Sequence, residues 1–136
     1  MIRSLAFALL SFLPAASFAD TWAVGGYDPV AYLSQDRAVA GRSDLATNWR
    51  GQQYHFATPE NRAAFEANPR AYVPGLAGYC VVALAEGRLE PGDPRNFVII
   101  GSRLYLVGSA SRKAQLLENP RELLMHARDR FVQLSR

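Results

Sequence analysis

The sequence predicts a small single α+β domain in which two hairpin-plus-helix units form one antiparallel sheet packed by helices. The main observation is a near-repetition: residues 54–72 read YHFATPENRAAFEANPRAY, and residues 105–123 read YLVGSASRKAQLLENPREL. Each copy begins in an apolar or aromatic run beside a glycine-containing turn, and continues with the pattern of a capped helix. We therefore expect an internal pseudo-repeat over about residues 45–73 and 96–124.

The strands are the first elements of each unit. β-branched and aromatic residues on both sides of a glycine turn are typical of hairpins, and the pattern is stronger in the second copy. In this alignment Tyr54 and Tyr105 occupy equivalent strand positions. The expected strands are residues 45–49 and 53–56 in the first unit, and residues 97–100 and 103–107 in the second.

A helix follows each hairpin. Thr58 and Ser109 are expected to cap these helices, because hydroxyl side chains accept hydrogen bonds from the free amides of a first turn. Pro69 and Pro120 then begin a second helix, since proline cannot continue a helix but suits its first turn.

The helices are expected to build the core. Phe65 and Leu116 occupy matching helix positions and should both be buried. The last helix, residues 120–134, carries apolar side chains on one side and arginines mostly elsewhere, which is typical of a helix that packs on a core. A partner-binding helix is the alternative interpretation.

Residues 1–19 have the features of a secretory signal peptide. Arg3 precedes an apolar run at residues 4–13, and small residues occupy the positions that a signal peptidase reads before the cut. The run is shorter than the roughly 20 residues that span a bilayer, which argues against an uncleaved anchor. We expect cleavage near Ala19 and Asp20, giving a periplasmic or secreted protein with no stable membrane insertion.

Removing nineteen of the 136 residues leaves 117, which suits one domain with a single core. The formal net charge falls from +3 to +2 with the loss of Arg3, which is too weak and too dispersed to predict nucleic-acid binding. Cys80 is the only cysteine, so an exported chain reaches an oxidising compartment without an internal disulfide. Cys80 is therefore buried and inert, free and reactive, or paired with another molecule.

Several segments carry a resemblance to the YHS-domain family, and most closely to its exported bacterial branch. They are GYDPVAYL at residues 26–33, YHFATPENRAAFEANPRAYVP at residues 54–74 and GYC at residues 78–80. GDP at residues 92–94 and RLYL at residues 103–106 fit the same branch. The resemblance covers most of the chain after the signal peptide, and it implies a compact α+β module often associated with heavy-metal handling.

The resemblance also says where a metal would be held. Metal-binding members use cysteines that follow an Asp-Pro-Val and lie within a Phe-Cys-x-x-x-Cys stretch. The matching positions here are Ala31, Ala57 and Asn61, and none of them supplies a thiolate. At most His55 and Cys80 remain as ligands for weak Cu(I) or Zn(II) binding, so we expect no stoichiometric metal in the purified monomer and no other cofactor.

Five residues are candidate ligand-binding positions. Asp28 is expected to cap a short helix; alternatively Tyr27, Asp28 and Tyr54 rim a small polar pocket. His55 and Cys80 are the other two, and they could converge as a soft two-ligand site or a Cys–His pair. A surface or hydrogen-bonded histidine is the simpler interpretation of His55.

Cys80 precedes the apolar run VVALA, residues 81–85. If the run is a helix, the sulfur lies near a helix N-terminus, where thiolates are favoured. If it is a strand, Cys80 is a small core residue. His126, in the basic final helix, is expected on the solvated surface.

Catalytic signatures are otherwise missing: the sequence has no G-x-S-x-G, no phosphate-binding glycine loop, no H-E-x-x-H and no C-x-x-C. We therefore expect no enzyme, since only Cys80 could carry catalysis. The leading hypothesis is a non-catalytic periplasmic binding or accessory protein of the YHS type, linked to heavy-metal handling and acting on an unknown protein partner or small ligand. The alternatives are a thiol-dependent enzyme or redox protein using Cys80, and a purely protein-interacting module.

Overall fold

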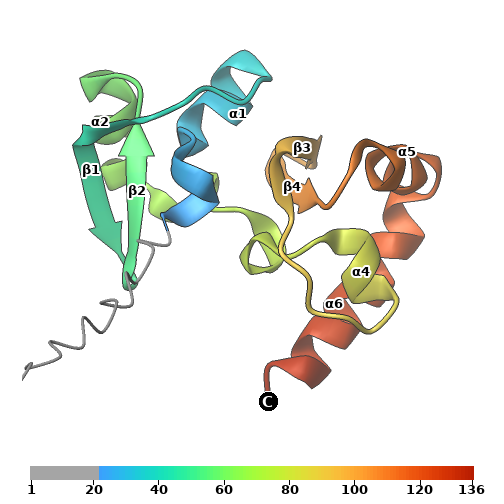
Figure 1. The fold of residues 1–136 in the computed structure, drawn as a ribbon. Coiled ribbons are helices and arrows are strands. Elements are labelled where there is room, and N and C mark those ends of the chain that lie inside the picture. Colours follow the sequence, from blue (N-terminus) through green and yellow to red (C-terminus); the bar gives the residue numbers. More distant parts are fainter. Residues whose placement is uncertain (1–21) are drawn as a thin grey trace, which may run out of the picture.

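The elements of the chain occur in two successive sets of the same order. The computed structural model describes residues 22–136, which we divide into a first half (residues 22–73) and a second half (residues 74–136). Each half contains a short 3-10 turn, a helix, a two-stranded hairpin and two further helices. Figure 1 shows the first half on the left and the second half on the right.

The bounds of the elements make the correspondence visible. In the first half they are η1 (Ala23–Gly26), α1 (Pro29–Gln35), β1 (Arg42–Trp49), β2 (Gln52–Phe56), α2 (Pro59–Ala67) and α3 (Pro69–Tyr72). In the second half they are η2 (Gly75–Gly78), α4 (Val81–Ala85), β3 (Asp93–Ile100), β4 (Arg103–Val107), α5 (Ala110–Glu118) and α6 (Pro120–Leu134).

The two hairpins have the same pairing. Both are antiparallel, with Thr47 opposite Tyr54 in the first and Val98 opposite Tyr105 in the second. Each also has a register irregularity at the same place, near the start of its first strand. Tyr54 and Tyr105 are therefore equivalent, as predicted. The structural duplication is longer than the two repeated phrases, because the 3-10 turns and helices before the hairpins also correspond.

The α+β class is confirmed, but the prediction that the two hairpins pair into one sheet is wrong. β1 and β2 form one two-stranded sheet, and β3 and β4 form another. α1 lies between the two hairpins (Figure 1), and its buried Tyr32 packs against Leu104 and Leu106 of β4. α1 packs on this face of β4 and separates the two hairpins, so the halves meet through side chains and not through a shared ladder of backbone hydrogen bonds.

Tyr32 also forms a polar link between the halves. Its hydroxyl donates a hydrogen bond of 2.7 Å to the backbone oxygen of Pro94. Burial is the main reason why the pKa of Tyr32 is raised well above its usual value. The hydroxyl therefore stays protonated and keeps its role as a donor.

The expected helix starts are present. The side chains of Thr58 and Ser109 accept amide hydrogen bonds from the first turns of α2 and α5. α3 begins at Pro69 and α6 begins at Pro120, as predicted. These two helices nevertheless differ in length, because α3 has four residues and α6 has 15.

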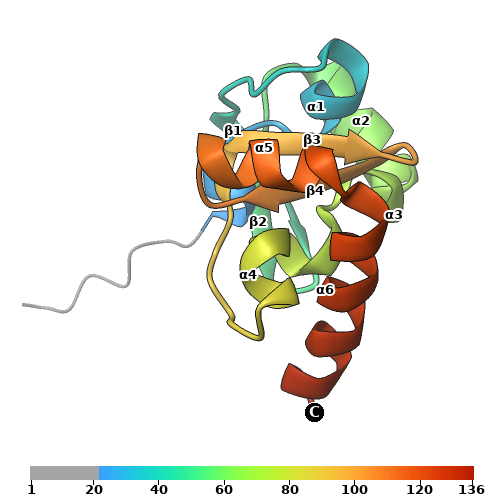
Figure 2. The ribbon, with the colours of Figure 1, turned by 90° about the vertical axis from the view of Figure 1, so that its right-hand side faces the viewer.

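Each half has its own apolar cluster. Phe65 and Leu116 are both fully buried, which confirms the prediction that they are matching core positions. The ring centroid of Phe65 lies 4.7 Å from that of Tyr54 and 5.1 Å from that of Phe56. Leu116 packs in the second cluster, to which α4 and the buried face of α6 contribute. Figure 2 shows α5 across the second hairpin and α6 continuing past α4.

The two 3-10 turns share an uncommon backbone. Val24 in η1 and Leu76 in η2 have φ angles of 54° and 56°, in the left-handed region that non-glycine residues rarely adopt. Each turn ends in a glycine with positive φ, Gly26 at 81° and Gly78 at 76°. A Cβ on Gly26 would also approach the Trp22 side chain to 2.9 Å. The glycine that ends both turns is therefore a structural requirement of the duplicated unit.

Within residues 22–136, no helix combines the length and the apolar character needed to cross a membrane. The predicted signal peptide, residues 1–19, and the cleavage point next to Asp20 lie outside the described residues.

Candidate functional site

Asp28 is a buried structural carboxylate. Its Oδ1 accepts the backbone N–H of Val30 at 2.9 Å, which caps α1 as the sequence predicted. Its Oδ2 accepts the backbone N–H of Ala57 and the side-chain amide of Asn61, both at 2.8 Å. With no exposed surface and three donors, this carboxylate is fully engaged in holding α1 against α2.

Ala31, Ala57 and Asn61, the three positions at which the resemblance to the YHS family would place metal-binding cysteines, are grouped around Asp28. Ala57 and Asn61 are its hydrogen-bond donors, and Ala31 is fully buried in the helix that it caps. Among residues 22–136, there is no group of three or more His, Cys, Asp or Glu side chains that could hold a metal ion. In this chain the corresponding place is therefore filled by an internally hydrogen-bonded carboxylate.

Cys80 occupies in the second half the place that Asp28 has in the first. It directly precedes α4, as Asp28 precedes α1, so the apolar run after it is a helix. Its side chain has no exposed surface and lies in the second apolar cluster. Its sulfur accepts the N–H of Gly108 at 3.2 Å, a contact equivalent to the one between Asp28 and Ala57. Cys80 is thus near a helix N-terminus and in the core at the same time.

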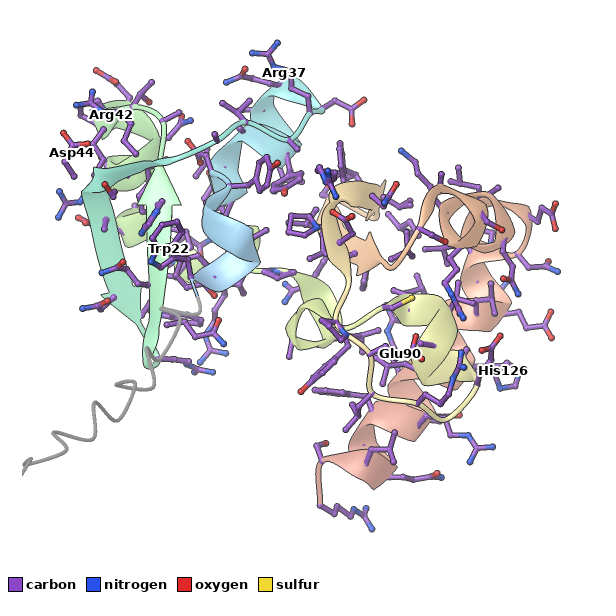
Figure 3. The ribbon with its side chains drawn as sticks, viewed as in Figure 1. Trp22, Arg37, Arg42, Asp44, Glu90 and His126 are labelled. Atoms are coloured by element: carbon purple, nitrogen blue, oxygen red, sulfur yellow. The ribbon has the colours of Figure 1, made fainter. Side chains whose placement is uncertain are left out.

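His55 is enclosed within the first half. It is 2% exposed, its Nε2 lies 2.9 Å from Oε1 of Gln53, and its ring centroid is 4.6 Å from that of Trp22. Cys80 lies in the core of the other half, so the structure does not bring the two candidate metal ligands together. His126 lies on the outer side of α6, half-exposed, with Nε2 3.7 Å from Oε1 of Glu122 (Figure 3).

The tyrosines of the expected polar pocket belong to two different hollows. Tyr27 lines a hollow with Trp22 and His55. Tyr54 lines a larger one at the junction of the two halves. Asp28 is enclosed below the surface by its hydrogen-bond donors. The three candidates are therefore not arranged around a single opening.

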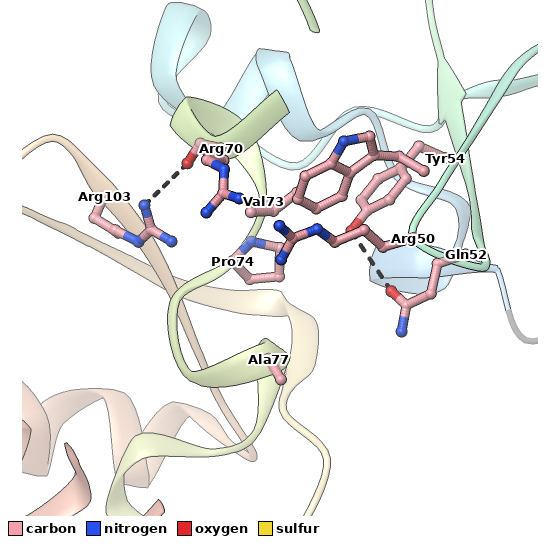
Figure 4. A pocket seen from close by; sticks show the side chains of 9 residues that line it. Arg50, Gln52, Tyr54, Arg70, Val73, Pro74, Ala77 and Arg103 are labelled. Carbon is pink, nitrogen blue, oxygen red and sulfur yellow. Dashed lines mark hydrogen bonds between the residues drawn. The ribbon is translucent and has the colours of Figure 1, made fainter. Parts of the chain in front are cut away.

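The larger hollow, which we call the junction pocket, has a volume of about 390 Å³. Arg50 and Arg70 come from the first half and Arg103 comes from the second. Tyr54 and Gln52 of β2 line the wall of the pocket that the first hairpin forms. Figure 4 shows Arg50 and Arg70 pointing toward one another across the pocket.

The remaining walls of the junction pocket are largely apolar. Trp49, at the end of β1, and the segment that joins the two halves supply them. That segment contributes Val73, Pro74 and Ala77. The pocket therefore combines a basic part with an apolar part, which is the usual composition of a site for a small organic molecule.

Two of the arginines are held in place by neighbouring groups. The guanidinium carbon of Arg50 lies 4.7 Å from the centroid of the Trp49 ring, as in a cation–π contact. Nη1 of Arg103 donates a hydrogen bond of 2.9 Å to the backbone oxygen of Arg70 (Figure 4). Both contacts leave other N–H groups of the guanidinium free for a ligand.

The neutral groups beside the arginines can also donate hydrogen bonds. The Tyr54 hydroxyl lies 3.5 Å from Oε1 of Gln52, at the limit of a hydrogen bond. Burial raises the pKa of Tyr54, so this hydroxyl stays protonated at neutral pH. Among the residues that the structure describes, no Asp or Glu lines the pocket.

Of these residues, sequence reasoning singled out only Tyr54 as a candidate. Arg70 belongs to the repeated Asn-Pro-Arg, but nothing in that motif distinguishes it from Arg121. Arg50 lies in a hairpin turn and Arg103 at the start of a strand, positions where a basic residue is commonplace. No family model, no curated protein and no solved structure matches this chain.

Proposed function

We propose that this chain is a non-catalytic binding or accessory module of the YHS type, which acts in the periplasm or outside the cell and holds a small ligand in the junction pocket. The observation that carries the proposal is the composition of that pocket: three arginines, a tyrosine hydroxyl and an apolar wall meet there, and none of its lining residues within 22–136 is acidic. Arg50 and Arg70 are exposed and Arg103 is half-buried, so water screens their charges in the free protein, and a ligand of opposite charge would gain attraction from all three.

The other candidate residues support a binding module over a thiol enzyme. Cys80 has no exposed surface, so a substrate could reach its sulfur only after the second core opened. Asp28 already accepts three hydrogen bonds and has no free lone pair directed at solvent. A role in heavy-metal handling would then depend on the ligand or on a partner, and not on a metal held around Ala31, Ala57 and Asn61.

The test is a thermal-shift screen of the chain from residue 20 onward against a library of small molecules, in wild type and two matched variants. Gln52→Trp places a large side chain in the junction pocket, whereas Asn48→Trp places one on a neighbouring exposed strand position outside it. We expect at least one compound to raise the melting temperature of wild type and Asn48→Trp but not of Gln52→Trp.

Two outcomes would contradict the proposal. One is stabilisation that persists unchanged in Gln52→Trp, which would place the ligand elsewhere. The other is turnover of the stabilising compound, detected by mass spectrometry and lost in Cys80→Ser, which would establish a thiol-dependent enzyme. Elemental analysis of the dialysed protein belongs to the same experiment, and we expect no stoichiometric copper or zinc.

A further inference from the structure

The junction pocket concentrates positive charge from three separate segments. Arg50 is in the turn of the first hairpin, Arg70 is in α3 and Arg103 begins β4. Arg50 and Arg70 are exposed and Arg103 is half-buried, so water screens part of their mutual repulsion, while together they create a positive potential at the pocket. The fold therefore brings together groups that an anion would stabilise.

These arginines differ from several others in the chain. Arg42, Arg62, Arg88, Arg95 and Arg112 each have a carboxylate oxygen within 4 Å. Within residues 22–136, neither Arg50, Arg70 nor Arg103 forms an ion pair. Among the described residues Arg37, Arg121, Arg128, Arg130 and Arg136 also form no ion pair, so the distinguishing feature of Arg50, Arg70 and Arg103 is that they line the same hollow.

The geometry of the groups selects the class of anion. A guanidinium offers a planar fork of N–H donors that matches two oxygens of a carboxylate or a phosphate. Arg50 and Arg103 are oriented by their contacts with Trp49 and with the backbone of Arg70, so less side-chain freedom is lost on binding.

The apolar part of the pocket adds a second requirement. Val73, Pro74 and the Trp49 side chain form a wall next to the basic groups. A bare inorganic ion would leave this wall in contact with water, whereas an organic anion would cover it.

We infer that the junction pocket binds a small organic anion with at least two negative charges next to a flat apolar group, that is, an aryl phosphate or an aromatic polycarboxylate. This inference rests on the proposed function, because it names the ligand class of the same pocket. The charges face Arg50, Arg70 and Arg103, the flat group lies against the apolar wall, and the Tyr54 hydroxyl and Gln52 amide donate to the remaining oxygens.

The experiment is isothermal titration calorimetry of the same chain, from residue 20 onward, with four probes. Phenyl phosphate and phthalate represent the two sources of charge, benzyl alcohol is the neutral analogue, and inorganic phosphate lacks the flat group. We expect one or both of the charged aromatic probes to bind, benzyl alcohol not to bind, and inorganic phosphate to bind at least threefold more weakly than phenyl phosphate. The charged probe that binds more tightly shows whether the pocket prefers a phosphate or a pair of carboxylates.

Charge-removing variants locate the site. In Arg50→Gln and Arg103→Gln we expect at least tenfold weaker binding of the charged probes, because each loses a charge-assisted pair of hydrogen bonds. Arg37→Gln is the matched control, because it removes the same charge from an exposed arginine that does not line the pocket. This variant should bind within twofold of wild type.

Three results would overturn the inference. They are no binding of either charged aromatic probe at millimolar concentration, equal binding of benzyl alcohol, and an equal loss in Arg37→Gln, which would indicate a non-specific response to net charge. A neutral library compound could still raise the melting temperature of wild type but not of Gln52→Trp. In that case the proposed function would stand, and only the inferred ligand class would be wrong.

Discussion

The two halves of the chain share a strand frame and differ in the helix that follows it. In the second half α6 runs for 15 residues, and Nη2 of its Arg128 donates to the Tyr105 hydroxyl at 3.1 Å. In the first half α3 ends at Tyr72, and the equivalent Tyr54 faces the junction pocket. Both tyrosines are 4% exposed and pack in the core of their own half, so the length of the following helix changes only what surrounds the hydroxyl. The long α6 supplies Arg128 to Tyr105, whereas the short α3 leaves the Tyr54 hydroxyl at the junction pocket.

A second difference lies at the start of each half. Asp28 and Cys80 both precede a short helix and accept an amide from the segment after the hairpin. Asp28 forms three hydrogen bonds, while the sulfur of Cys80 accepts one. Polar bonding therefore fixes α1 in the first half, whereas apolar packing fixes α4 in the second.

The largest expected effect is a loss of stability in variants of the two cores, and it tests whether Phe65 and Leu116 contribute equally to the free energy of unfolding. Phe65→Ala should lower the free energy of unfolding by about 3–5 kcal/mol and Leu116→Ala by about 2–5 kcal/mol, because each leaves a cavity at a fully buried position. The measurement is chemical denaturation followed by two spectroscopic probes. Leu117→Ala, next to Leu116 but 55% exposed, is the control and should stay within about 0.5 kcal/mol of wild type.

In both core variants the transitions seen by the two probes should coincide. If Phe65→Ala unfolds the first half while the second half remains native, the halves are independent domains, and a single cooperative domain is excluded.

A smaller effect should separate Asp28 from Cys80. Asp28→Ala is expected to cost about 3 kcal/mol, because it leaves the buried donors of Ala57 and Asn61 without an acceptor. Cys80→Ala should cost about 1 kcal/mol, since it removes one weak sulfur acceptor and little volume. Denaturant titration of both variants gives the comparison.

Asp44→Ala is the control for the loss of a carboxylate. Asp44 is exposed and paired only with Arg42, so its removal should change stability by less than about 1 kcal/mol. A cost for Cys80→Ala equal to or greater than that for Asp28→Ala would show that the polar contacts of Asp28 do not fix α1.

The smallest effect concerns the two tyrosine hydroxyls. Without ligand, Tyr105→Phe should cost about 1 kcal/mol because it removes the hydrogen bond from Arg128. Tyr54→Phe should stay within about 0.5 kcal/mol of wild type, since its hydroxyl has only a 3.5 Å contact with Gln52. Denaturant midpoints at constant m-value measure both. Equal losses would mean that the Tyr54 hydroxyl is as well bonded as its counterpart.

Local patterns were sufficient to predict much of the fold. The hairpins, the caps at Thr58 and Ser109 and the helix starts at the two prolines all depend on neighbouring residues, and all are present. The different lengths of α3 and α6 also had a signal. Pro74 follows closely after Tyr72 and prevents the helix from continuing, whereas no proline follows Pro120.

The arrangement of the hairpins and the composition of the pocket could not be predicted in the same way. Whether two hairpins share a ladder depends on long-range packing, and here α1 lies between them and packs on one face of β4. The pocket depends on arginines from a turn, a short helix and a strand, far apart in the sequence. Their proximity is a property of the tertiary structure alone. GYD and GYC, which mark the ends of equivalent turns in the two halves, are the local signal in the sequence for the longer duplication.

The position of Tyr32 has a consequence for how the chain opens. Tyr32 belongs to the first half but completes an apolar cluster with Leu104 and Leu106 of the second, and its hydroxyl is bonded to Pro94. Parting the halves would expose an aromatic ring on one side and two leucines on the other. Neither half is a closed foldon, so the slowest-exchanging amides of both should exchange with solvent through one shared global opening.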